Sequence, residues 1–332
     1  MLGTAASAAY PCCMTRFPRF TGPRLIAALA LLSAAALAVA PGQAQAQSQL
    51  PVDWNFASGA LAGFFAPDSP PPGADNWNCK PSTAHPYPVI LVNGTFANED
   101  DNWQAASPLL ANHGYCVFAF NYGGTGYVTA TGDIATSAGQ LGAFVTQVLA
   151  ATGAAKVDLV GHSQGGMMPR YYLKFLGGAR YVNDLVALAP SNSGTTLDGL
   201  TTLASSLGVI GLVNSAINPL CPACVEQEQG SSFLTSLNSG GDTVPGVHYT
   251  VIESKDDEVV TPYTNAFPTG SGATNITVQN QCPLDASDHL EIAADPVALA
   301  DVLNALDPAA PVRVPCLVVL PVTGPIGLVP PF

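Results

Sequence analysis

The segment 159–172, LVGHSQGGMMPRYY, restricts the fold more than any other part of the chain. It begins as a short apolar run, passes through small residues around Ser163 and continues with the pattern of a helix. A strand that turns this sharply needs glycines where neighbouring backbone passes close by. The helix start also directs free N–H groups and a partial positive charge at the serine oxygen. Gly161, Ser163 and Gly165 match G-x-S-x-G in the strand–turn–helix context that this motif requires, so we predict that Ser163 is a nucleophile.

Short apolar runs on both sides of this turn predict the strands of a parallel sheet. Helical patterning lies between them, at 103–113, 134–152 and 164–176. Strands that alternate with helices predict βαβ units, and we therefore expect an α/β three-layer sandwich with a mostly parallel central sheet. Functional side chains are expected at the carboxyl ends of its strands. The predicted strands are YPVILVN (87–93), YCVFAFNY (115–122), KVDLVG (156–161), DLVALAP (184–190) and VHYTVIES (247–254).

A serine hydroxyl is a poor nucleophile unless a base accepts its proton. His289 alone among the five histidines follows all the predicted core strands and lies in a loop before a helix. The carboxylate that orients such a histidine is expected between the serine and the histidine in sequence. Asp257, in ESKDDEVVTPY after a strand, is the preferred candidate, and Asp288 is a weaker one. The remaining histidines lie inside the serine turn or before a strand: His85, His113, His162 and His248.

Two backbone donors are predicted to stabilise an oxyanion beside Ser163. One is the N–H of Gln164, the residue after the nucleophile. The other belongs to the loop VNGTFAN (92–98), where Gly94 allows close approach and Thr95 offers its N–H and a hydroxyl. Each such donor typically contributes about 10²–10³ in rate. This chemistry requires no metal and no organic cofactor.

The first 46 residues have the pattern of a secretory signal peptide. Three arginines precede the apolar run LIAALALLSAAALAVA (25–40), and AQA (44–46) follows it as a cleavage signal. The run is short for a membrane span of about 20 residues, and no later stretch is expected to cross a bilayer. We therefore predict a secreted protein without stable membrane insertion, with residues 47–332 as the catalytic domain.

The charge of the mature chain excludes one class of partner. Without the signal peptide, seven basic residues remain against 23 acidic ones, which gives a net charge of −16. Such a chain is repelled by nucleic acid and by anionic lipid headgroups. We expect a monomer whose partner is a lipid or ester substrate, with an oil–water interface as a place where the two can meet.

Six cysteines remain after residue 46, and an even number in a secreted chain predicts three disulfides. Proximity in the expected fold favours Cys79–Cys116, Cys221–Cys224 and Cys282–Cys316 among the 15 possible pairings. CPAC (221–224) also permits a redox or zinc motif, which the absence of a nearby second Cys/His pair disfavours.

Segment 195–240 is longer than an ordinary crossover between two strands requires. It is apolar and rich in small residues. Two interpretations stand side by side: a pair of helices that pack on the domain, or a cap whose inner face meets an apolar substrate.

Five segments in order, PVILVNGTFAN, GHSQGG, VALAPSNSGT, DDEVVTPY and CPLDASDH, resemble the secreted bacterial lipases of actinobacteria. The resemblance covers about residues 77–292. It implies an α/β-hydrolase that cleaves acyl esters, with Ser163 as nucleophile, Asp257 as acid, His289 as base, and Thr95 with Gln164 as oxyanion donors. These relatives usually carry histidine where Asn93 stands, so a different support of that loop is expected. The carboxyl-terminal segment PCLVVLPVTGPIGLVPPF matches no pattern of the family.

The predicted function is hydrolysis of lipid esters by a triacylglycerol lipase or carboxylesterase. A polyester depolymerase would use the same chemistry in an open site, against which a long cap argues. A non-catalytic secreted binding protein on a hydrolase scaffold is the third hypothesis, against which the apparent triad argues.

Overall fold

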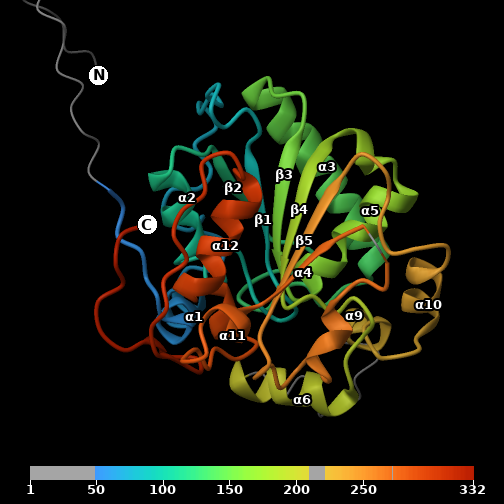
Figure 1. Cartoon of the computed structure of the whole chain (residues 1–332). Helices are drawn as coiled ribbons and strands as arrows, with labels where there is room; N and C mark the ends of the chain where they lie inside the picture. The colour runs from blue at the N-terminus through green and yellow to red at the C-terminus, as the bar shows by residue number, and fades with distance from the viewer. Residues whose placement is uncertain (1–48, 209–220, 271) are drawn as a thin grey trace, which may run out of the picture. The chain divides into compact units, whose positions relative to one another are not determined.

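The computed structural model describes residues 49–208, 221–270 and 272–332 (Figure 1). The predicted signal peptide, residues 1–46, lies outside this part of the chain. Residues 209–220 of the predicted cap also lie outside it.

Six parallel strands form one sheet in the order β2-β1-β3-β4-β5-β6. Every residue of β1, β2 and β3 is buried, as expected when helices cover both faces of a parallel sheet. The predicted α/β class is therefore confirmed. β6 is not among the predicted strands, because its segment TNIT is short and partly exposed. The strands are β1 (Val89–Val92), β2 (Val117–Ala119), β3 (Val157–His162), β4 (Val182–Leu188), β5 (His248–Glu253) and β6 (Thr274–Thr277).

Helices pack on both sides of the sheet. Figure 1 shows α2 and α12 on one side and α3 and α5 on the other. The α-helices are α1 (Phe56–Phe65), α2 (Ala106–Asn112), α3 (Ile134–Thr152), α4 (Gln164–Met167), α5 (Pro169–Phe175), α6 (Leu197–Ser206), α9 (Pro222–Glu226), α10 (Ser232–Asn238), α11 (Val278–Gln281) and α12 (Pro296–Leu306). Single 3₁₀ turns occupy Gly178–Arg180, Tyr263–Ala266 and Glu291–Ala293.

Helix α3 has the bounds that the sequence predicts, because both of its ends are capped. The Asp133 side chain accepts a hydrogen bond from the N–H of Thr136, and Gly153 ends the helix with φ of 78°. By length and composition, α3 is the one helix of the described residues that is apolar enough to cross a membrane. Its apolar residues form a stripe in the core that includes Leu141 and Val145, so burial in the domain accounts for the composition.

The predicted helix 164–176 is divided into α4 and α5. Pro169 has no N–H to donate to the preceding turn, and it takes the first position of α5. The four residues of α4 therefore form a separate turn directly after Ser163, and all four are buried.

The structure contains the three favoured disulfides, Cys79–Cys116, Cys221–Cys224 and Cys282–Cys316. Cys79–Cys116 joins the amino-terminal segment to the start of the β2 region. Cys221 and Cys224 are bonded to each other, so neither provides a free thiolate as a zinc ligand.

The carboxyl-terminal segment, which no sequence pattern placed, packs next to the loop that carries His289. It includes a short antiparallel pair, β7 (Val319–Leu320) and β8 (Gly324–Pro325). The N–H of Val322 donates to the Asp288 carboxylate at 3.2 Å, and the N–H of Ala286 donates to the carbonyl of Val319 at 3.0 Å. The tail thus fixes the chain on one side of His289.

The described part of segment 195–240 contains α6, α9 and α10. Figure 1 shows α6 and α9 beyond the end of the sheet at which β3 leads into α4. Leu200, Leu203 and Ala204 of α6 are buried. The described helices α6 and α9 therefore lie near the carboxyl ends of the strands, where functional side chains are expected.

Candidate active site

Ser163 lies in strained backbone between β3 and α4. Its φ of 55° and ψ of −122° are unusual for a residue other than glycine. A Cβ on Gly161 would overlap the carbonyl of Gly165, and a Cβ on Gly165 would overlap the carbonyl of Val92. The two glycines therefore permit a turn so tight that the serine side chain is held out at the strand end.

The structure brings the three predicted side chains into one chain of hydrogen bonds. Oγ of Ser163 lies 2.9 Å from Nε2 of His289. Nδ1 of His289 lies 2.7 Å from Oδ2 of Asp257. Ser163 is 3% exposed and His289 is fully buried, so these contacts form away from bulk water. This arrangement is the one in which Ser163 can act as nucleophile, His289 as base and Asp257 as the group that orients the base.

The charges of the buried pair are set by each other. Burial raises the pKa of the Asp257 carboxyl, but His289 and two backbone N–H groups outweigh burial and bring the pKa below its usual value. Burial lowers the pKa of His289, but the charge and hydrogen bond of Asp257, together with the charges of Glu258 and Asp288, outweigh burial and bring this pKa above its usual value. Asp257 is thus ionised, and it stabilises the imidazolium form of His289.

Asp257 is held in place through its second oxygen. Oδ1 accepts hydrogen bonds from the N–H groups of Val259 at 2.7 Å and Val260 at 2.8 Å. The weaker candidate, Asp288, does not contact the imidazole of His289, since its carboxylate accepts from the N–H groups of Glu291 and Val322. The geometry therefore favours Asp257.

The sequence suggests that the carboxylates near Asp257 are surface or loop groups, and for Glu253 this expectation is wrong. It is the last residue of β5 and is fully buried. Burial raises the pKa of its carboxyl well above the usual value, and the charge of Asp257 acts in the same direction. Glu253 is therefore a neutral acid beside Asp257.

The predicted oxyanion donors lie side by side. Gly94 places its loop against the serine, since a Cβ there would lie 3.1 Å from Cβ of Ser163. Oγ1 of Thr95 lies 2.7 Å from Oε1 of Gln164. Because that amide oxygen only accepts, the Thr95 hydroxyl proton is engaged there. Among the described residues, the backbone N–H groups of Thr95 and Gln164 have no hydrogen-bond partner.

Asn93 supports this loop where histidine is usual in the relatives. Its side-chain Nδ2 donates to the carbonyl of Ala97 at 2.7 Å and contacts Oγ1 of Thr129 at 3.2 Å. The hydroxyl of Tyr122 donates to the backbone carbonyl of Asn93 at 2.6 Å. The asparagine thus closes the turn internally.

His162 has a role that its position in the sequence does not reveal. The residue inside the turn is expected to point away from Ser163. Its Nε2 lies 2.8 Å from the carbonyl oxygen of His289, and its Nδ1 lies 3.1 Å from Oδ1 of Asn102. Asn102 in turn accepts from the N–H of Gly94 at 2.8 Å. Because the carbonyl oxygen only accepts, Nε2 of His162 donates to it, and this hydrogen bond connects the serine turn to the His289 loop.

Two pockets differ in how near they lie to the strand ends that carry Ser163. The larger one, of about 520 Å³, is lined by Asp184 and His248 at the amino ends of β4 and β5. It is far from the strand ends that carry the site. A pocket of about 240 Å³ lies beside Phe96, the residue after Thr95. Its other described apolar lining residues are Ala60, Phe64, Tyr127 and Leu207.

A model of the family Lipase (class 2) matches residues 86–300, which include every candidate site residue. The chain belongs to the class 2 lipase family. The chain is 47% identical over 90 residues to a triacylglycerol lipase of Pseudarthrobacter phenanthrenivorans, over 26% of this chain and 27% of the relative. A triacylglycerol lipase of Burkholderia plantarii is also 47% identical over 90 residues, over 26% of this chain and 24% of the relative. The matched segments span only about a quarter of these two relatives.

Lipase B of Pseudozyma antarctica is 31% identical to this chain over 152 residues, which are 44% of this chain and 40% of the relative. Among solved structures, Aspergillus fumigatus lipase B has a TM-score of 0.53 and 20% identity, over 73% of this chain and 56% of that chain. At this identity the structural likeness supports the fold of this chain and carries no statement about its substrate.

Proposed function

We propose that this chain is a secreted serine hydrolase that cleaves carboxylic ester bonds of lipids through an acyl-enzyme on Ser163. One observation carries the proposal. Ser163, His289 and Asp257 are linked by contacts of 2.9 and 2.7 Å at the strained turn after β3. Membership of the class 2 lipase family supports the same chemistry.

The proposed reaction begins when Oγ of Ser163 attacks the ester carbonyl carbon. His289 accepts the hydroxyl proton at Nε2, and Asp257 stabilises the imidazolium that forms. The backbone N–H groups of Thr95 and Gln164 donate to the carbonyl oxygen as it becomes negative. When the tetrahedral intermediate collapses, the alcohol leaves with the proton from His289 and the acyl group stays on Ser163. A water molecule, deprotonated by His289, then attacks the acyl-enzyme, and Ser163 regains its proton as the fatty acid leaves.

An apolar acyl chain fits the surroundings of the oxyanion loop. The pocket beside Phe96 brings together apolar side chains from four separate segments of the chain, with Asp101 as an acidic residue in its lining. Burial of an acyl chain against such side chains contributes about 0.8 kcal/mol per CH₂ group. The pocket is small, which favours a short or medium acyl chain at this position.

The proposal includes export from the cell. Residues 1–46 have a basic segment, an apolar run and an A-x-A signal. The three disulfides support an oxidising compartment, since such bonds are rare in the cytosol. We propose that the exported chain acts as a monomer.

Ser163→Ala tests the chemistry directly. Hydrolysis of p-nitrophenyl butyrate is expected to fall by at least about 10³-fold, while the thermal unfolding midpoint stays nearly unchanged. A variant that retains turnover contradicts the proposal. Comparison of tributyrin, olive oil and a polyester film then separates a lipase or esterase from a polyester depolymerase, because only the latter releases monomers from the film.

A further inference from the structure

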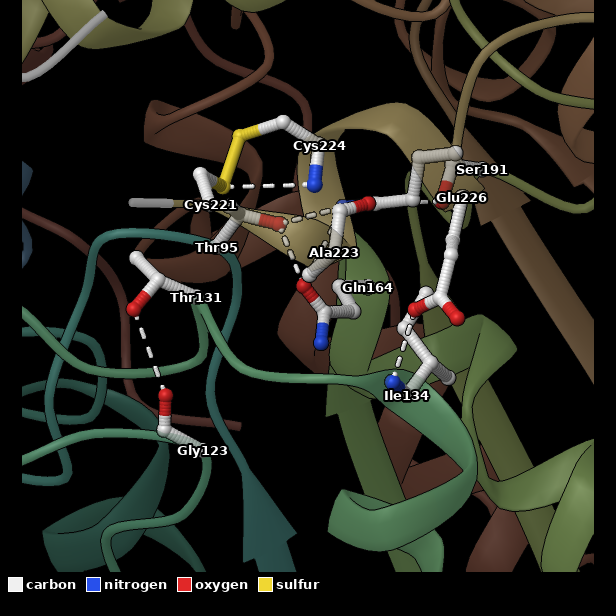
Figure 2. The surroundings of a disulfide bond; sticks show 11 residues. Thr95, Gly123, Thr131, Ile134, Gln164, Ser191, Cys221, Ala223, Cys224 and Glu226 are labelled. Atoms are coloured by element: carbon white, nitrogen blue, oxygen red, sulfur yellow. Dashed lines mark hydrogen bonds between the residues drawn. A yellow bond between two sulfur atoms is a disulfide. The ribbon is translucent and has the colours of Figure 1, made fainter. Parts of the chain in front are cut away.

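Gln227 contacts both of the residues that we assign to the oxyanion hole. It follows α9 directly and is 1% exposed. Its Nε2 lies 2.8 Å from Oγ1 of Thr95 and 3.1 Å from Oε1 of Gln164. Figure 2 shows Thr95 and Gln164 next to the Cys221–Cys224 disulfide, although the disulfide is remote from them in sequence.

The polar atoms of this group leave Gln227 only one orientation. Ser191 Oγ lies 2.9 Å from Oε1 of Gln227 and donates to it. The carbonyl of Ala223 only accepts, so the amide nitrogen 3.1 Å from it is the donor and faces Thr95 and Gln164, while the Thr95 hydroxyl donates to Gln164. Thr95, Gln164 and Gln227 thus form a closed triangle of buried hydrogen bonds. Loss of one member leaves buried polar groups without partners, which costs about 1–3 kcal/mol per group.

The short helix α9, whose first turn is bridged by the Cys221–Cys224 disulfide, holds Gln227 in this position. The five residues of α9 are too few to form a stable helix alone. Cys221 and Cys224 are joined across its first turn, and the N–H of Cys224 lies 3.2 Å from Sγ of Cys221. Both the backbone N–H and the Nε2 of Gln227 contact the carbonyl of Ala223, each at 3.1 Å.

Two further contacts attach α9 to the rest of the domain. The N–H of Ala223 donates to the carbonyl of Thr131 at 3.1 Å. The N–H of Ile134, at the start of α3, donates to the Glu226 carboxylate at 2.7 Å. Figure 2 shows these residues around the disulfide. The helix is therefore fixed at both ends, with Gln227 facing the serine turn.

We propose that Gln227 is a positioning residue for the oxyanion hole, and that the Cys221–Cys224 disulfide holds it there. The inference rests on the proposed function of Ser163. Oxyanion donors act at 2.7–3.1 Å from the charged oxygen, so a small displacement of the Thr95 or Gln164 backbone weakens them. Because this charge exists only in the transition state, loss of Gln227 lowers kcat more than it raises KM.

Gln227→Leu removes the hydrogen bonds while it retains an apolar side chain of similar bulk. We expect kcat for p-nitrophenyl butyrate to fall about 10–100-fold and KM to change less than about threefold. Affinity for an aliphatic trifluoromethyl ketone, which forms a tetrahedral oxyanion on a serine, should fall by a similar factor. The matched control is Gln229→Leu, since Gln229 is exposed and lies two residues further on; its kcat and ketone affinity should stay at wild-type values.

The disulfide is tested with Cys221→Ser/Cys224→Ser, compared with Cys79→Ser/Cys116→Ser. The first pair closes a short loop of sequence separation 3 and the second a long one of separation 37. Loss of the short loop should lower kcat as Gln227→Leu does, with a small change in thermal midpoint. Loss of the long loop should lower the midpoint and leave kcat unchanged at temperatures where the protein is folded.

Combination of Gln227→Leu with Cys221→Ser/Cys224→Ser decides whether the two act together. A shared role predicts that the combined loss of kcat is no larger than the larger single loss. Three results would overturn the inference. The losses of kcat could multiply in the combined variant, Gln227→Leu could keep wild-type kcat, or Gln227→Leu could bind the ketone as tightly as Gln229→Leu does. Failure of the proposed function is recognised separately, because Ser163→Ala would then retain activity.

Discussion

Nε2 of His162 lies 2.8 Å from the carbonyl oxygen of His289. The residue that precedes Ser163 is thus hydrogen-bonded to the backbone of the histidine that faces Ser163. A carbonyl oxygen only accepts, and His162 therefore carries its proton on Nε2. Burial lowers the pKa of His162 to about 3, and the nearby His289 acts in the same direction. His162 thus stays neutral near pH 7 and serves as a fixed connection between two loops.

Replacement of His162 tests this connection. In His162→Leu the loop of His289 loses one anchor, and a displacement of about 1 Å between reacting groups costs about 10²-fold in rate. We expect kcat for p-nitrophenyl butyrate to fall about 10–100-fold. His248→Leu is the control, since His248 is exposed at the opposite end of the sheet. Equal activities of the two variants would show that the connection is unimportant.

The pH dependence of kcat/KM should report the titration of His289. Its pKa is raised above 6.5 in the folded protein, and only the neutral imidazole accepts the serine proton. Activity is therefore expected to decline as pH falls through a midpoint above about 6.5. In Asp257→Asn the midpoint should move down, because the charge that raises this pKa is gone, and kcat should fall by about 10³–10⁴-fold. A midpoint that does not move in Asp257→Asn contradicts the assignment of the acid.

Gly165 should tolerate no side chain. A Cβ there overlaps the carbonyl of Val92, which belongs to the neighbouring strand β1. We expect Gly165→Ala to lower the free energy of unfolding by about 3 kcal/mol or more, measured by urea denaturation. Gly139→Ala is the matched control, because Gly139 is exposed within α3 and its Cβ would meet no atom within 4 Å. It should stabilise the protein by about 0.5–1 kcal/mol.

Glu291 should make stability decline with rising pH. Burial raises the pKa of its carboxyl to about 9 in the folded state, against an ordinary value of 4.5. The folded state therefore binds a proton that the unfolded state has released, and stability is lost as pH rises from about 4.5 toward 9. Between pH 5 and pH 8, Glu291→Gln should lose about 1–2 kcal/mol less unfolding free energy than the wild-type protein loses. An unchanged difference would show that Glu291 does not carry this titration.

Local patterns predict much of the fold and the main geometry of the site. Buried parallel strands appear as apolar runs, and α3 is bounded by Asp133 and Gly153. The order Ser163, Asp257, His289 is readable because each residue follows a predicted strand at the expected edge of the sheet. The break at Pro169 is also visible in the sequence, although the helical pattern continues across it.

Long-range hydrogen bonds account for what the sequence does not reveal. Gln227 meets Thr95 across 132 residues, and His162 meets His289 across 127. Neither contact has a local signature, since glutamine and histidine occur in many environments. The burial of Glu253 also has no local signature, because a carboxylate at a strand end resembles a surface residue until the packing around it is known.

Labelling with a fluorophosphonate probe, followed by mapping of the modified peptide by mass spectrometry, tests the central proposal most directly. A serine activated by His289 should react once per chain, with the adduct on Ser163, and His289→Ala should suppress the reaction although Ser163 remains present. Thermal unfolding of the same samples establishes that the variant is folded. An unlabelled wild-type protein, or an adduct on another residue, would contradict the assignment of Ser163 as the nucleophile.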